Sequence, residues 1–324
     1  MDRARTPGFL IGGLLIVLAV ASIAAAKAGE LDVIHAARWL APGADPARAL
    51  STRMSECLPA IADPEQRYSV EIGRAAFRSP LLLGGQASRA GVSCETCHQG
   101  GRNNPDFDFP GLSGAPGTAD VTTALFSSHR DDGIDNPKPI PDLSGPKMAL
   151  KISQEPNGRA LETFLHGTVT EEFDGAEPPP AVLHGLADYV RTLSPAACPA
   201  DKRVPLRAED DLSNAVRAVR VAGDALGRGD RPTALVMLSA ARQQLGLVNE
   251  RYDAPSAAPS RVVLTTASAD LAADISAVRA GDATTNVRLT AWLAQEPAWA
   301  RTVVAQEPSS LFDPHRLAAA GPVR

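Results

Sequence analysis

The feature of this sequence that most constrains its fold is Cys94-Glu95-Thr96-Cys97-His98, a CxxCH motif. Two thiols on one helical turn can each form a thioether with a vinyl group on the same edge of a porphyrin, and the adjacent imidazole can then bind the iron. The motif predicts one covalent haem c, attached at Cys94 and Cys97, with His98 as the proximal ligand. Only 4% of the residues are aromatic, and a haem would supply the large apolar body that such a core lacks.

Two other kinds of site contain a CxxC pair: a thiol–disulfide redox centre and half of a zinc site. A zinc site needs further Cys or His at matched spacing, and the sequence holds no second CxxC and no HxxxH. A thioredoxin-like pair is expected inside a βαβ pattern, which this sequence lacks. The haem interpretation is therefore the strongest of the three.

The N-terminus resembles an export signal. Arg3 and Arg5 precede an uncharged, mostly apolar run at 9–26, which a small-x-small pattern and Lys27 end. Residues 1–26 are expected to be a signal peptide cleaved before Lys27 or an uncleaved membrane anchor, since the run is just long enough to span a bilayer. A buried core helix is the third alternative. Either of the first two alternatives places the rest of the chain in the periplasm, where disulfides can form. In the second, residues 9–26 would anchor the chain in the inner membrane.

Charge and length limit the functions to consider. Lys and Arg number 32 against 37 Asp and Glu, and the net charge of -5 excludes a generalised nucleic-acid binder, which would need a basic face. A length of 324 residues predicts two domains. The 27 prolines and 26 glycines predict long irregular loops.

Local patterns predict a helical extension at 27–62, followed by a domain at 63–200. Asp63 and the proline after it form a helix start. Residues 79–146 show neither helical nor strand periodicity, and a stretch of that kind normally wraps something functional. Helices of this domain are expected at 63–78, 159–166 and 181–193.

The composition changes after Pro205, and residues 205–324 carry apolar side chains at helical spacing. Gly229-Asp230 and Gly281-Asp282 each stand between two such runs, because Gly ends a helix through its tolerance of positive φ and Asp caps the next helix. The pattern predicts a small antiparallel bundle, made from one helical hairpin used twice or from unrelated helices.

Four segments carry a resemblance to a known family. They are Ile72–Pro80, Ser88–His98, Asn136–Leu143 and the closing helix Leu183–Leu193. The first three resemble the bacterial di-haem cytochrome c peroxidases and their relatives in methylamine utilisation, and the closing helix is similar to the terminal helix of class I cytochrome c domains. The resemblance covers about 63–194 and implies a class I cytochrome c-like haem domain with long irregular loops. Together with the helical bundle that the apolar spacing predicts after it, the chain is expected to be all-α.

The resemblance also implies specific contacts. Gly73 and Phe77 are expected to cross the closing helix near Tyr189, where a missing side chain lets two backbones approach. Because the first and last helices of a cytochrome c domain cross, Cys57 and Cys198 are expected to lie together and form a disulfide. The alternative is two separate buried thiols.

The sequence departs from that family in holding one CxxCH motif where the peroxidases hold two. Cys57 and Cys198 have no neighbouring Cys or His and cannot form a second motif. The peroxidase activity is therefore not carried over, and one-electron transfer by a single haem remains.

The ligand on the other face of the iron is expected to be Met148, which follows a Pro-rich loop. A methionine there could instead fill a gap in the haem pocket. The other candidates are His129, His166 and His184, or the site is open. A methionine ligand would raise the reduction potential relative to a second histidine.

The sequence thus predicts a periplasmic mono-haem c-type cytochrome that passes electrons to and from a redox partner protein, with no catalytic residue of its own. The bundle would serve docking or oligomerisation. One alternative is a peroxidase-like haem enzyme with an open sixth site, in which Glu171, Glu172 or His166 would act as acid–base groups. Another is a haem-bearing partner subunit of a redox complex.

Overall fold

The computed structural model describes residue 31 and residues 33–146, 152–155 and 158–320. It is mostly helical, with 59% helix and 4% strand, which confirms the all-α class. The predicted export segment at 1–26 and Met148 lie outside the described residues. In the part of the chain that the structure describes, no helix combines the length and apolar character needed to cross a membrane.

The elements follow one another along the chain in three groups. The extension and the residues that follow it hold η1 (His35–Trp39), α2 (Pro46–Ser51), β1 (Thr52–Met54), α3 (Pro64–Phe77), α4 (Pro80–Leu83), α5 (Gly85–Ala90), α6 (Cys94–Cys97) and η2 (Gln99–Gly101). The middle of the chain holds β2 (Thr118–Ala119), β3 (Lys138–Pro139), α7 (Ala160–Gly167), α8 (Pro180–Thr192) and β4 (Arg203–Pro205). The last group holds α9 (Ala208–Gly227), α10 (Arg231–Asn249), α11 (Ala258–Ala280), α12 (Thr285–Ala305) and α13 (Pro314–Ala319).

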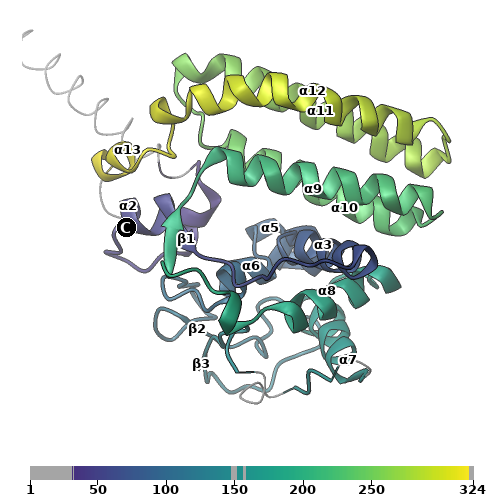
Figure 1. The fold of residues 1–324 in the computed structure, drawn as a ribbon. Helices are drawn as coiled ribbons and strands as arrows, with labels where there is room; N and C mark the ends of the chain where they lie inside the picture. Colours follow the sequence, from purple (N-terminus) through teal and green to yellow (C-terminus); the bar gives the residue numbers. More distant parts are fainter. Residues whose placement is uncertain (1–30, 32, 147–151, 156–157, 321–324) are drawn as a thin grey trace, which may run out of the picture.

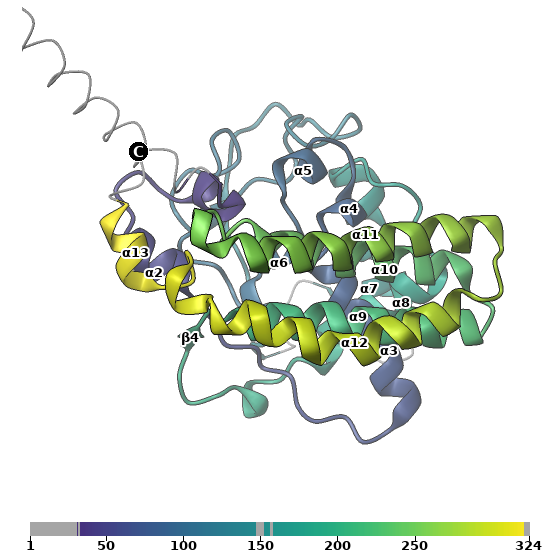
Figure 2. The same cartoon turned by 90° about the horizontal axis from the view of Figure 1, so that it is seen from above.

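The long helices are stacked in layers (Figure 1). The α11–α12 pair lies on the α9–α10 pair, which in turn lies on α3. Figure 2 shows from above that α11 lies over α10 and α12 over α9. One cluster of buried apolar side chains extends from Val70 and Ile72 of α3 through Leu212 and Leu238 of the bundle. The bundle therefore shares a core with the preceding residues.

Helix α3 begins as predicted. Asp63 accepts a hydrogen bond from the Gln66 backbone N–H at 2.7 Å, and Pro64 occupies the first helical position, where no N–H is needed. Its Gly73 lies against Gly185 of α8 so closely that a Cβ on Gly73 would stand 1.9 Å from the Gly185 carbonyl oxygen. The expected crossing of the first and closing helices, with two backbones in contact, is confirmed.

The stretch at 79–146 is less irregular than predicted at its start. Helices α4, α5 and α6 occupy 80–97, each too short to show a hydrophobic period. Between Arg102 and Pro146 the chain is loop, apart from the two-residue strands β2 and β3, which pair antiparallel.

The bundle consists of the two predicted helix pairs. Gly229 and Gly281 take φ values of 77° and 78° after α9 and α11, so both end these helices as expected. Asp230 caps α10 by accepting from the Thr233 N–H at 3.0 Å. Asp282 does not cap α12: it accepts from Thr284 instead, in a local turn, and the helix begins only at Thr285. The expectation of a helix start at Asp282 was wrong, because its side chain bonds the residue two positions on.

The extension at 31–62 packs against segments from the middle and the end of the described chain. Strand β1 pairs antiparallel with β4, and α2 packs against α13 through buried Leu50 and Leu317. The predicted disulfide is present, with the sulfurs of Cys57 and Cys198 at 2.11 Å. It ties the segment before α3 to the segment after α8. The extension is helical only in part, since β1 is a strand.

Candidate haem-attachment site

The CxxCH motif folds as one short helix. Ser93 precedes α6 as its N-cap, and its backbone N–H donates to the Thr96 hydroxyl at 3.0 Å, one half of a capping box. The His98 N–H donates to the Cys94 carbonyl at 2.8 Å and closes the turn. Cys94 and Cys97 are both free thiols, half-buried and packed against the apolar core. The predicted spacing of two thiols on one helical turn is therefore present.

Burial of the two thiols raises the pKa of Cys94 to about 12 and that of Cys97 to about 12. Thiol–disulfide exchange relies on a thiolate, which redox CxxC motifs obtain by lowering a cysteine pKa. The surroundings of Cys94 and Cys97 act in the opposite direction. They are apolar, as a porphyrin edge requires.

The His98 ring is held by a backbone carbonyl. Its Nδ1 lies 3.0 Å from the Pro141 oxygen, and because a carbonyl can only accept, Nδ1 carries the hydrogen. Nε2 is then left with a free lone pair. Burial lowers the pKa of His98 to about 4, so the ring is neutral at physiological pH. A neutral imidazole whose other nitrogen donates to a carbonyl is the usual state of a metal-ligating histidine.

The loop that supplies this carbonyl is fixed on both sides of Pro141. The Ile140 N–H donates to the Gly117 carbonyl at 3.0 Å, and the Leu143 N–H donates to the Gly101 carbonyl at 2.9 Å. Both bonds tie the Pro-rich loop to the residues that follow the motif. Pro141 is thus positioned over His98 by backbone pairing.

The helix crossing lies beside the same histidine. The Phe77 ring is 6.4 Å from the His98 ring and meets Tyr189 edge-on at 5.1 Å, measured between centroids. The contact expected between Phe77 and Tyr189 is confirmed. The close approach of α3 and α8 therefore forms one wall next to the motif.

The structure places three of the four candidate sixth ligands at the surface. The side chains of His129, His166 and His184 are 62%, 39% and 57% exposed. Each lies near a carboxylate. The pairs are His129–Asp174 at 3.8 Å, His166–Glu177 at 2.8 Å and His184–Glu162 at 3.0 Å. These partners account for all three histidines without an iron.

The candidate acid–base group Glu171 is also paired. Its carboxylate lies 2.6 Å from Arg130, and its side chain is 54% exposed. Among the described residues, no group of three or more His, Cys, Asp or Glu side chains could hold a metal ion by itself.

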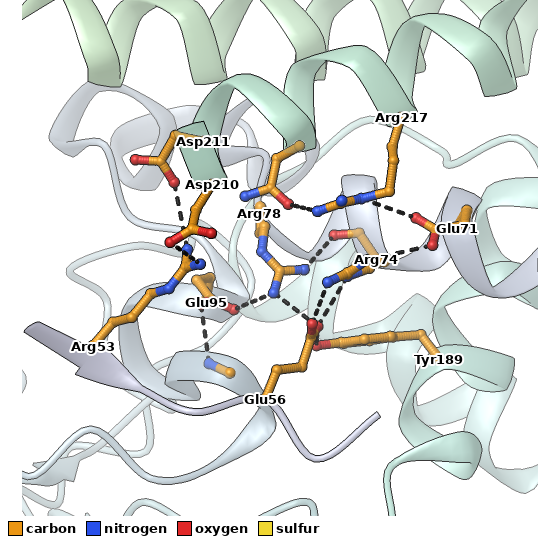
Figure 3. A network of polar contacts seen from close by, with 12 residues as sticks. Arg53, Glu56, Glu71, Arg74, Arg78, Glu95, Tyr189, Asp210, Asp211 and Arg217 are labelled. Carbon is orange, nitrogen blue, oxygen red and sulfur yellow. Dashed lines mark hydrogen bonds and ion pairs between the residues drawn. The ribbon is translucent and has the colours of Figure 1, made fainter. Parts of the chain in front are cut away.

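Sequence reasoning missed a cluster of ionic side chains behind the motif (Figure 3). We call it the buried charge cluster; its members are Arg53, Glu56, Glu71, Arg74, Arg78, Glu95, Tyr189, Asp210, Asp211 and Arg217. Most of them come from β1, α3, α6, α8 and α9; Glu56 lies between β1 and α3, and Arg78 directly follows α3. A sequence signal for it is the pair of arginines four positions apart at the end of α3, Arg74 and Arg78.

Glu56 is the hub of this cluster. Its carboxylate accepts from Arg78 Nη2 at 2.9 Å, from Arg74 Nε at 3.1 Å and from the Tyr189 hydroxyl at 2.8 Å. The two guanidiniums hold the pKa of Glu56 far below its usual range, although burial acts to raise it. The cluster thus joins α3, α8 and the segment next to the disulfide.

No family model matches the chain, and no match was found among the curated proteins or the solved structures.

Proposed function

We propose that this chain is a periplasmic mono-haem c-type cytochrome that carries one electron at a time between redox partner proteins. The observation that carries the proposal is the state of His98. Its Nδ1 is engaged by the Pro141 carbonyl, and its Nε2 is free on a neutral ring directly after two unpaired thiols. This is the donor arrangement that a c-type haem needs.

Cys94 and Cys97 would hold the porphyrin covalently, and His98 would bind its iron. When bound, the haem would supply an iron that alternates between ferric and ferrous states. The residues around it would do the rest. The Pro141 carbonyl would orient the imidazole, and the buried Phe77 ring beside it would limit the access of water.

The proposed compartment is supported by the disulfide. Cys57 is fully buried and bonded to Cys198, and such bonds persist in oxidising compartments such as the periplasm. Together with the apolar run at 9–26, this favours an exported protein, free or anchored to the inner membrane.

The test is covalent haem content. The full chain is produced with its export segment in a bacterium that matures c-type cytochromes, then run on a denaturing gel with haem-peroxidase staining. One haem per chain is expected by the pyridine haemochrome assay. The Cys94→Ala/Cys97→Ala variant is the control and should be unstained. A wild-type band that is pure, full-length and colourless would refute the proposal.

A second candidate, a haem enzyme with an open sixth site, is favoured by one observation. The three histidines that could close the site are exposed, and each has a carboxylate partner. Closure then depends on Met148. A carbon monoxide difference spectrum of the reduced protein separates the two: an electron carrier with a methionine ligand responds weakly, and an open iron binds at once.

A further inference from the structure

We propose that the C-terminal bundle sets the reduction potential of the haem, through the charges that its helix α9 adds to the buried charge cluster. This inference rests on the proposed function, because it concerns the potential of the same haem. It assigns a role to α9 that electron transfer alone does not require.

One member of the cluster lies inside the haem motif. Glu95 stands between the two cysteines, and its Oε1 accepts from the Gly100 N–H at 3.0 Å, which ties the turn after His98 back to α6. Its Oε2 is buried, has no hydrogen-bond partner and lies 3.7 Å from Arg78 Nη2. Arg78 is therefore the ion-pair partner of the one carboxylate that lies inside the motif.

Arg78 links Glu95 to the other members of the cluster. Its side chain is only 9% exposed, and it shares Glu56 with Arg74. Arg74 in turn contacts Glu71 at 3.3 Å, and Glu71 contacts Arg217 of α9 at 3.6 Å. A continuous chain of ion pairs thus runs from the haem motif to the bundle (Figure 3).

A second connection runs through β1. Arg53 contacts Asp210 at 3.1 Å and Asp211 at 3.5 Å, and both acids belong to the first turn of α9. The Asp211 side chain is 12% exposed. Helix α9 therefore contributes two carboxylates and one guanidinium to the cluster, so this helix adds more negative than positive charge.

The sign of the effect follows from the haem charge. The ferric haem carries one more positive charge than the ferrous haem, so a nearby carboxylate stabilises the ferric form and lowers the potential. A guanidinium does the reverse. In a buried site these interactions are weakly screened and extend further than at the surface.

The experiment measures the midpoint potential of the haem-loaded full chain by optical redox titration. It is done at about pH 8, well above the ordinary range of carboxylates, because burial raises the pKa of Glu95 and that of Asp211. Asp211→Asn is expected to raise the midpoint, and Arg217→Gln is expected to lower it. Glu95→Gln should raise it more than Asp211→Asn does, because Glu95 belongs to the motif. Arg217 keeps its charge at this pH, since burial lowers its pKa only to about 10.

Arg228→Gln is the matched control. Arg228 also bridges the bundle and α3, through Glu65 at 2.7 Å, but both side chains are largely exposed, at 47% and 70%. Its removal should leave the midpoint unchanged because water and salt screen the pair.

The outcomes are distinguishable. This inference is overturned if haem is attached in every variant and the midpoint potentials of Asp211→Asn and Arg217→Gln do not move, or move in the same direction. The proposed function would then remain intact. No haem on the wild-type chain would overturn the proposed function itself. If Asp211→Asn does not fold, the opposite shifts expected of Glu95→Gln and Arg217→Gln still decide.

Discussion

Replacing Gly73 with alanine tests the helix crossing on which the candidate site is built. The added Cβ would lie 1.9 Å from the Gly185 carbonyl oxygen and 2.3 Å from its carbon, whereas real Cβ atoms essentially never come within 3.0 Å of another heavy atom. Both contacts are backbone, so no side chain can rotate away. Helices α3 and α8 must separate by roughly 1 Å or more.

The cost of this separation can be worked from the packing. A gap of about 1 Å forfeits up to about half of the van der Waals attraction of each atom pair across the contact, and each pair contributes about 0.1–0.2 kcal/mol. The crossing also holds the edge-on contact of Phe77 with Tyr189, which would loosen. We expect Gly73→Ala to lower the free energy of unfolding by about 3 kcal/mol, the upper end of overpacking effects.

The assay is urea unfolding followed by far-ultraviolet circular dichroism, which does not depend on a haem. Gly246→Ala is the matched control, because Gly246 lies within α10 and a Cβ there would meet nothing within 4 Å. Alanine should stabilise that helix by about 0.5–1 kcal/mol. If Gly73→Ala leaves the free energy of unfolding within about 0.5 kcal/mol of the wild type, the inferred crossing is wrong.

Three further outcomes are expected. Replacing Cys57 and Cys198 with serine should cost about 5 kcal/mol at most in urea unfolding, since their sequence separation of 141 closes a long loop. In haem-loaded wild type, in which thioethers would occupy Cys94 and Cys97, two thiols that titrate after denaturation without reductant would contradict the bond. Met148→Ala should lower the midpoint potential and change the haem spectrum, and a variant with both unchanged would show that Met148 is not the ligand. Two arginines lower the pKa of Glu56 in the folded chain. The Glu56 carboxylate should therefore stabilise the fold fully at a pH above its unfolded-state pKa of about 4.3, and this stabilisation should decrease progressively as the pH falls below that value. The wild-type advantage over Glu56→Gln should therefore be constant from neutral pH to about pH 5 and decrease steadily on further acidification, and an advantage as large at about pH 3 as at neutral pH would contradict this.

Features encoded by neighbouring residues were predictable from the sequence. Asp63 and the proline after it define the start of α3, and Gly229 and Gly281 end two bundle helices. In each case the cause is local, a capping oxygen or a positive φ. The Cys57–Cys198 bond was reached differently, through the resemblance to cytochrome c domains.

Features that depend on distant parts of the chain were not predictable where no resemblance covered them. Strand β1 has three residues and pairs with β4, so neither segment shows a strand period of its own. Glu95 reads as an ordinary variable position of a CxxCH motif, and only the fold shows that Arg78 and Glu56 lie behind it. The error at Asp282 was local: its side chain had two competing backbone partners, and composition does not decide between them.

For a chain that is exported as we propose, the pairing of the extension with the end of the chain would set an order of events. A chain that crosses a membrane from its N-terminus presents Thr52–Met54 long before Arg203–Pro205, and α2 before its partner α13. Until those later segments emerge, the early ones have nothing to pair with, and contacts so distant in sequence form slowly. In the proposed export, Cys94 and Cys97 would therefore reach the periplasm while the chain in front of them is still open. We expect cofactor attachment to precede closure of the extension.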